Sequence, residues 1–272
     1  MGFAVNHSRR SPLAGFLCAV AACLFGALPA QAQSAVAPVP PDTAVTVKAL
    51  MARGVEAYNG GSLTVALDAF HQAAAMGVVE AMMYLGVMYG TGRGVDVDHA
   101  ASMAWFRHAA DAGNSQAMCN IGLIYFQGLG QPKDYGEAMS WFRRSGSFGN
   151  AEAMFNVGVL YRDGLGVPVN DTEAMNWFKK ASDAADDIAA NAIGVLYQQG
   201  LGVSVDYVLA MSWYQRAAQA GNAAALYNIG VLWEGGLGVA PDRAQAIDWY
   251  TKAAAAGNPS AKAALKSLGV KD

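Results

Sequence analysis

The chain has little charge of either sign and almost no cysteine. Charged residues make up 14% of its 272 residues, and the formal net charge is −3. A nucleic-acid-binding domain needs a basic face, so this balance argues against nucleic acid as a partner. Two of the three cysteines, Cys18 and Cys23, lie in an N-terminal segment that we expect to be removed, which leaves Cys119. An intrachain disulfide is therefore excluded from the mature chain, and packing must supply its stability.

The chain also lacks the motifs of common catalytic and metal sites. Its histidines form no H-x-x-x-H pair, and neither G-x-S-x-G nor S-x-x-K occurs. Gly-x-Gly pairs recur, but they follow predicted helices and lack the further Gly or Lys that a phosphate-binding loop requires. We therefore predict no catalytic residue, no bound cofactor and no metal site.

Residues 1–32 have the pattern of an export signal. Arg9 and Arg10 precede an uncharged apolar stretch over 13–28, and an A-x-A cleavage site ends at Ala32. The apolar stretch is about 16 residues long, shorter than the roughly 20 of a transmembrane helix. We place the cut after Ala32 and expect a periplasmic or secreted protein. Removing two arginines and no acid changes the net charge from −3 to −5.

Two features of this segment leave other routes open. The arginine pair partly matches a twin-arginine signal, so both the general secretory and the twin-arginine route are possible. Val20-Ala21-Ala22-Cys23 resembles a lipobox, which would make Cys23 a lipidated N-terminus. The apolar run continues past Cys23 into the A-x-A site, which favours a soluble product. We expect membrane association only if Cys23 is lipidated.

A fixed period of 36 residues organises the rest of the chain, as in a solenoid. The period is clearest in one column of tryptophans: Trp105, Trp141, Trp177, Trp213 and Trp249. Five such repeats fill residues 80–258. A shorter helical pair is expected over 44–79, after a Pro-rich linker over 33–43. Residues 259–272 are expected to form a C-terminal capping helix and tail.

Each repeat has the pattern helix A, loop, helix B, which predicts an all-α fold. In the third repeat, apolar residues at helical spacing predict helix A over 152–162, and Gly164 ends it. Asn170 is placed to cap helix B, as Ser62 is for the short first pair. Ala185 stands where other repeats have a glycine after helix B, so we expect an irregular junction there.

Two positions that recur in every repeat, a glycine in helix A and an aromatic pair in helix B, have structural explanations. A glycine inside each helix A costs about 1 kcal/mol relative to Ala, so close approach by the aromatic helix B must require it. The Trp-Phe or Trp-Tyr pair of helix B is expected to pack in the core. Lys and Arg recur in the C-terminal half of helix B, where they complement the helix dipole as a solvated ridge or bind an anionic partner.

The repeats resemble a known family. Ala225-Leu226-Tyr227-Asn228-Ile229-Gly230 and Gly200-Leu201-Gly202-Val203 are similar to the SEL-one-like repeat, a relative of the tetratricopeptide repeat, and the likeness extends from Met51 to the C-terminus. The resemblance implies a right-handed α/α superhelical solenoid of antiparallel helix pairs that serves as an adaptor for protein or peptide partners. The alternative it implies is a cell-envelope hydrolase or penicillin-binding protein of the beta-lactamase-like branch. Members of that branch carry paired cysteines in each repeat, which this chain lacks.

A partner-binding groove can be located by helical angle. Residues on the side of helix A away from its core positions should line the concave surface of the solenoid. Asn120, Asn156 and Asn228 form a column that either grips a peptide backbone or bonds to the adjoining loop. The predicted groove residues are Phe126, Phe155, Asn156, Arg162, Asn191, Gln198, Tyr227 and Glu234. The oligomeric state is not indicated.

Overall fold

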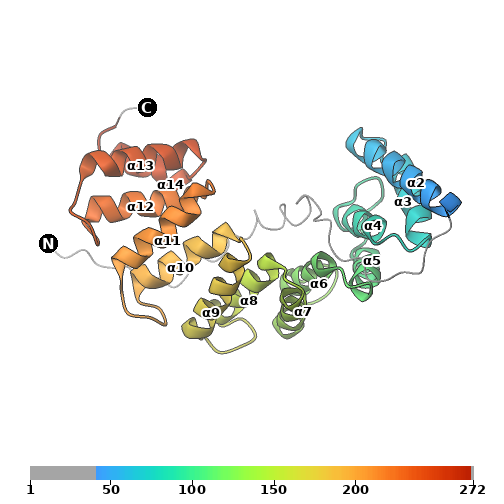
Figure 1. Ribbon diagram of the computed structural model, residues 1–272, viewed down its shortest axis with the longest axis horizontal. Coiled ribbons are helices and arrows are strands. Elements are labelled where there is room, and N and C mark those ends of the chain that lie inside the picture. Colours follow the sequence, from blue (N-terminus) through green and yellow to red (C-terminus); the bar gives the residue numbers. More distant parts are fainter. Residues whose placement is uncertain (1–40, 271–272) are drawn as a thin grey trace. The chain divides into compact units, whose positions relative to one another are not determined.

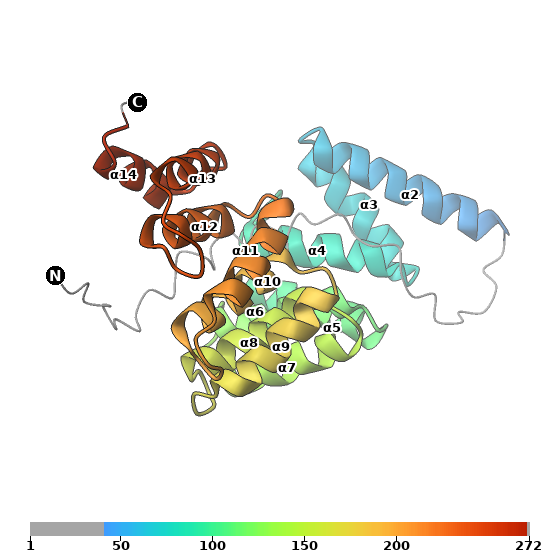
Figure 2. The same ribbon diagram turned by 60° about the vertical axis from the view of Figure 1, so that its left-hand side comes forward.

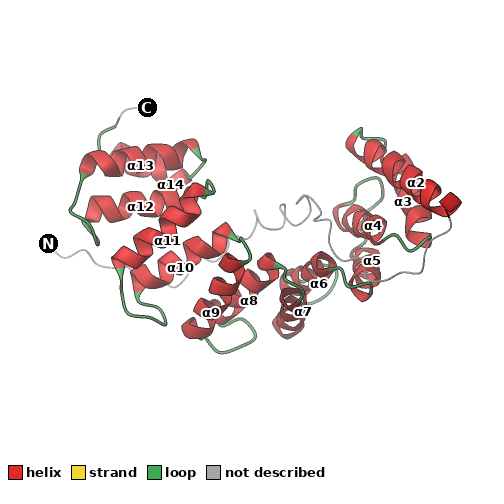
Figure 3. Cartoon of the chain, in the orientation of Figure 1, coloured by secondary structure: helices red, strands yellow, loops and turns green. Residues whose placement is uncertain are grey.

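The computed structural model describes residues 41–270, and every regular element in that range is an α-helix (Figures 1 and 3). The predicted signal peptide and most of the predicted linker lie outside the described residues. Within the described range, no helix combines the length and the apolar character that a membrane span requires. The chain divides into two compact units, one ending at Lys133 and the other beginning at Asp134. Each unit is described by itself.

The first described helix begins at Pro41, three residues before the expected start at residue 44, and it is longer than the helices that follow. The helices of this unit are α2 (Pro41–Asn59), α3 (Leu63–Ala75), α4 (Val79–Thr91), α5 (His99–Asp111) and α6 (Ser115–Gln127).

The second unit contains three complete helix pairs, with one helix before them and one after. The helices alternate between the A and B types of the repeat, and each A helix packs against the B helix that follows it (Figure 2). The B helices are α7 (Tyr135–Ser147), α9 (Asp171–Asp183), α11 (Tyr207–Gln219) and α13 (Arg243–Ala255). The A helices are α8 (Ala151–Asp163), α10 (Asp187–Gln199), α12 (Ala223–Gly235) and the terminal α14 (Pro259–Ser267).

Short polar side chains begin nearly every helix, as the sequence predicts. Asn170 accepts a hydrogen bond from the Glu173 backbone N–H at the start of α9. The same bond is made by Asp98, Asp134, Asp206 and Asp242 before B helices, and by Asn114, Asn150, Asp186, Asn222 and Asn258 before A helices. Val78, before α4, has no polar side chain to make this bond, and the Ser62 side chain, before α3, also makes none. The Ser62 backbone, at φ −79° and ψ 63°, follows a tight turn and lacks the extended conformation of the other caps.

The glycine inside each A helix lies against the ring of its own B helix. A Cβ atom on Gly158 would lie 2.5 Å from Phe178 Cε1, and one on Gly194 would lie 2.5 Å from Tyr214 Cε1. Gly86 and Gly230 have the same relation to Phe106 and Tyr250. No side chain fits at such distances, so the predicted steric reason for these glycines is confirmed at these four positions.

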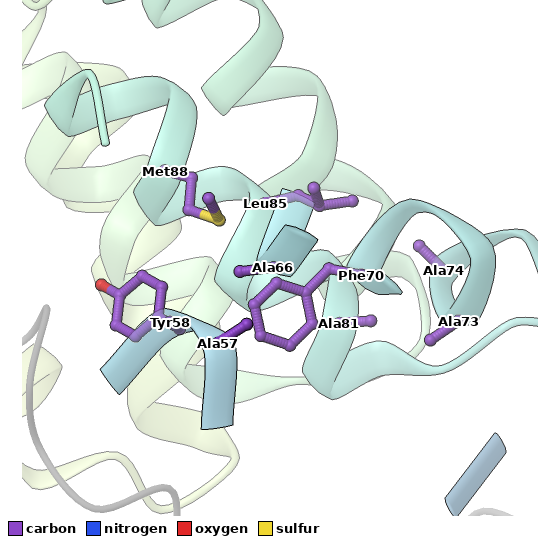
Figure 4. Close-up of a cluster of buried hydrophobic side chains, with 9 residues drawn as sticks. All are labelled: Ala57, Tyr58, Ala66, Phe70, Ala73, Ala74, Ala81, Leu85 and Met88. Carbon is purple, nitrogen blue, oxygen red and sulfur yellow. The ribbon is translucent and has the colours of Figure 1, made fainter. Parts of the chain in front are cut away.

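The short first pair has the same contact, at a glycine that sequence analysis missed. A Cβ atom on Gly54 would lie 2.5 Å from Phe70, whose ring projects from α3 between α2 and α4 (Figure 4). The glycine and the ring are 16 positions apart here and 20 apart in the pair Gly86 and Phe106. The segment between glycine and ring is therefore four residues shorter in the first pair.

The junction after α9 keeps the regular geometry despite its alanine. Ala185 has φ 68°, the single positive value at a non-glycine residue in the described range, where Gly149 and Gly221 have 85° and 83°. The backbone N–H groups of Ala185 and Asp186 donate to Ser182 and Ala181, as their counterparts do at the other junctions. The expected irregularity is therefore absent, and Ala185 instead adopts a left-handed conformation that costs an L-residue about 1–2 kcal/mol.

Gly158→Ala should destabilise the fold by about 1–2 kcal/mol, because overpacking of the rigid Phe178 ring outweighs the better helix propensity of Ala. Urea unfolding of the wild type and the variant measures the change. In a Phe178→Leu background the same substitution should cost less, since the smaller side chain leaves room. An equal cost in both backgrounds would contradict the steric explanation.

Ala185→Gly should raise the free energy of unfolding by about 0.5–1 kcal/mol, because glycine adopts positive φ without a steric penalty. Ala184→Gly is the matched control, since Ala184 has φ −88° and gains nothing from glycine. Thermal unfolding of both variants tests the prediction, and an equal shift in midpoint would rule out the backbone as the cause.

Candidate partner-binding face

The predicted groove residues do not all fall in one unit. Phe126 lies on α6 in the first unit, whereas the others lie on α8, α10 and α12 in the second. We call six of these the A-helix face. Its members are Phe155, Arg162, Asn191, Gln198, Tyr227 and Glu234.

The two aromatic residues of the A-helix face rest on the core. The ring centroids of Phe155 and Phe178 are 5.3 Å apart, and those of Tyr227 and Tyr250 are also 5.3 Å apart. Phe155 and Tyr227 are half-buried, while Phe178 and Tyr250 are buried. Each face ring therefore contributes to packing within its repeat and remains partly exposed.

Buried tyrosines reach the A-helix face through their hydroxyl groups. The Tyr214 hydroxyl donates to Gln198 Oε1 at 2.5 Å, and the Tyr250 hydroxyl donates to Glu234 Oε2 at 2.6 Å. In both pairs the acceptor residue lies 16 positions before the tyrosine, so two successive repeats combine a buried tyrosine with an acceptor at the same position. The sequence shows this spacing, but only the packing of the two helices shows that the tyrosine and the acceptor form a hydrogen bond.

The third repeat has Phe178 at the tyrosine position, and its face residue has a different partner. Arg162 forms a two-bond ion pair with Asp163, at 2.7 Å from Nε to Oδ1 and 2.9 Å from Nη2 to Oδ2. The charge of Arg162 is thus compensated within α8.

Asparagine side chains link neighbouring A helices. Asn228 Nδ2 donates to Asn191 Oδ1 at 3.0 Å, so Asn228 bonds to the preceding repeat and not to the adjoining loop. The other two amide atoms, Asn191 Nδ2 and Asn228 Oδ1, have no hydrogen-bond partner among residues 41–270. Asn156 is 1% exposed, and neither of its amide atoms has a hydrogen-bond partner among the residues described. Buried amides normally form hydrogen bonds, so Asn156 differs in this respect from most buried polar groups.

One cation on each B helix of the second unit lies over the tryptophan of that helix. Lys180 Nζ is 4.2 Å from the Trp177 ring centroid and Lys252 Nζ is 4.5 Å from that of Trp249. Arg144 and Arg216 make the same contact with Trp141 and Trp213. The predicted basic ridge therefore packs its cations on half-buried indoles, an arrangement worth about 0.5–1 kcal/mol at an exposed site.

No metal site accompanies this face. Among the residues that the structure describes, no group of three or more His, Cys, Asp or Glu side chains could hold an ion.

Together, the consecutive A and B helices and the side chains they present define a helical-repeat solenoid. The Sel1 repeat model matches residues 79–114, 115–147, 151–186, 187–222 and 223–258. These matches cover more than half of the sequence, and the chain belongs to the Sel1 repeat family. The resemblance seen in the sequence is thereby confirmed. No curated protein matches the chain.

Solved structures support the same assignment. A Sel1 repeat protein from Oxalobacter formigenes is 34% identical, with a TM-score of 0.75 over 83% of this chain and 90% of that one. The protein c5321, a protective antigen of uropathogenic Escherichia coli with an SLR fold, is 32% identical, with a TM-score of 0.72. That match covers 84% of this chain and 49% of c5321. The immunity protein PA5088 from Pseudomonas aeruginosa, at 16% identity and a TM-score of 0.53, shares the fold alone, over 82% of this chain and 85% of that one.

The Tyr214→Phe, Tyr250→Phe double variant should lose about 1 kcal/mol of stability per hydroxyl at neutral pH. Burial raises the pKa of both hydroxyls, and at Tyr250 the hydrogen bond to Glu234 raises the pKa further. An unfolded tyrosine ionises near about pH 10, so the stabilisation is complete below that pH and is lost as pH rises above it.

The double variant should therefore lose less stability than the wild type between about pH 8 and about pH 10.5. Urea unfolding at the two pH values measures both losses. Tyr207→Phe serves as the control, because no hydrogen bond of its hydroxyl occurs in the described part of the chain. A fall of the same size in the double variant and the wild type would contradict this account.

Proposed function

We propose that the chain is an exported, non-catalytic adaptor that holds a protein or peptide segment on the A-helix face. The observation that carries the proposal is the bonding capacity of that face. Asn228 donates one hydrogen bond to Asn191, which leaves Asn191 Nδ2 and Asn228 Oδ1 without a partner among the described residues. Phe155 and Tyr227 of the same face are half-buried. Aromatic rings beside fixed polar groups are typical of protein-binding surfaces.

Membership of the Sel1 repeat family supports this function, because such repeats typically act as protein-interaction scaffolds. A solenoid presents the same helix positions at regular intervals, so an extended segment can contact several repeats at once. No observation favours the alternative of a cell-envelope hydrolase.

Export is proposed from the sequence of residues 1–32 alone. The periplasmic or secreted location, the cut after Ala32 and the lower priority of lipidation at Cys23 all rest on that segment. Intact-mass analysis of the protein purified from its source cell distinguishes these products. A mature chain beginning at Gln33 supports soluble export, whereas a modified Cys23 would establish a lipid anchor instead.

A photo-crosslinking side chain at Gln199 should capture the partner in source cells, because Gln199 is exposed beside Gln198. The same group at Thr251, exposed on the B helix α13, is the positional control and should give no adduct. Phe155→Leu with Arg162→Ala should reduce the adduct about tenfold, while Leu keeps apolar packing on Phe178. An adduct that forms equally at Thr251, or that persists in the double variant, would overturn the proposed face.

A further inference from the structure

The A-helix face changes its chemistry along the second unit. Each of these repeats contributes two residues to the face, and both lie on its A helix. The third repeat presents Phe155 and the compensated Arg162, and the fourth presents the amides Asn191 and Gln198. The fifth presents Tyr227 and the carboxylate of Glu234.

Charge is distributed unequally between the two helix types. The A helices α8, α10 and α12, with the cap of α10, hold five acids and one base, so their formal charge is 1 − 5 = −4. The acids are Glu152, Asp163, Asp186, Asp187 and Glu234, and the base is Arg162, which pairs with Asp163. The C-terminal half of the B helices carries the cations that lie over tryptophan. On the terminal helix α14, Lys262 and Lys266 are exposed.

Glu234 is the carboxylate best placed to receive a partner's cation. It is exposed, and the Tyr250 hydroxyl fixes Oε2 at 2.6 Å, which leaves Oε1 with no hydrogen bond to any described residue. Tyr250 in turn packs its ring on that of Tyr227, so the three side chains form one connected line across α12 and α13. A lysine or arginine has an apolar stem that packs on a tyrosine ring and a charged end that pairs with a carboxylate.

We propose that the A-helix face binds an extended peptide segment through a lysine or arginine side chain, which pairs with Glu234 and packs on Tyr227. The peptide's main chain lies along the Asn191 and Asn228 amides, and an apolar side chain follows at Phe155. This inference rests on the proposed function and adds the chemistry of the partner. Charge complementarity carries it: Arg162 is paired with Asp163, so the carboxylate of Glu234 is the one charge of the face that no described residue compensates.

The chain itself supplies a conservative test variant. Glu234→Gln removes the charge and keeps an acceptor for the Tyr250 hydroxyl, as Gln198 already provides for Tyr214. The variant should therefore fold with the wild-type unfolding midpoint. Glu137→Gln on the B helix α7 is the matched control, because Glu137 is an exposed carboxylate outside the A-helix face.

The experiment selects peptides from a phage-displayed random nonapeptide library on the purified full chain. Enriched sequences should share a Lys or Arg at a fixed spacing from a large apolar residue. Fluorescence polarisation of a labelled enriched peptide should show about tenfold weaker binding to Glu234→Gln and unchanged binding to Glu137→Gln. Replacing the peptide's basic residue by norleucine should weaken binding to wild type to the same extent and have little further effect on Glu234→Gln.

The possible failures are distinguishable. Peptides that bind wild type and Glu234→Gln equally, yet lose affinity for Phe155→Leu with Arg162→Ala, would overturn the basic-residue inference and leave the proposed function standing. Failure to enrich any peptide, or enrichment that no change on the face affects, would overturn both. Self-association in sedimentation that Glu234→Gln abolishes would identify a second copy of the chain as the occupant and overturn the peptide inference.

Discussion

The close approach of an aromatic ring to a helical glycine is the contact on which each repeat depends. The ring of helix B lies where a Cβ atom of helix A would otherwise be, at about the same distance in every pair from Gly54 to Gly230 for which the contact is described. Glycine weakens an isolated helix, so the sequence accepts a local cost of about 1 kcal/mol at each position to bring two helices together. Burial of the large rings offsets that cost, since a fully buried aromatic side chain contributes several kcal/mol to stability.

The same rings connect the core to the face that we propose for binding. In the third repeat Phe178 ends inside the protein, and the face is completed by the ion pair of Arg162 with Asp163 on α8. A tyrosine extends one oxygen further and fixes the side chain of Gln198 or Glu234 from below. The difference between phenylalanine and tyrosine at this buried position is therefore accompanied by a different polar residue on the surface, while the packing of the helix pair stays the same. Nearly identical repeats thus present different side chains on the same helix face.

Neighbouring repeats are joined by polar contacts between a B helix and the next A helix. His71 bonds to the Tyr89 hydroxyl, Arg107 bonds to that of Tyr125, and Arg143 bonds to that of Tyr161, each pair 18 residues apart. In the second unit, Arg216 and Asn258 also donate to backbone carbonyls about one repeat earlier in the chain. These contacts are exposed or partly buried, so each contributes modestly, and apolar packing remains the main source of stability.

The sequence by itself determined the helical class, the 36-residue period, most helix caps and the role of the recurrent glycines. Some of these features follow from signals within a few residues, such as a capping side chain that bonds to the backbone N–H three positions later. The others follow from the same residue type recurring at one position of every repeat. Only the tertiary structure revealed that Ser62 makes no cap, that Gly54 belongs to the glycine column and that Ala185 keeps a left-handed backbone. It also decided how the face is built, because the pairs Tyr250 with Glu234 and Asn228 with Asn191 join residues 16 and 37 positions apart. Contacts at such separations depend on how whole helices pack, which no local pattern of residues specifies.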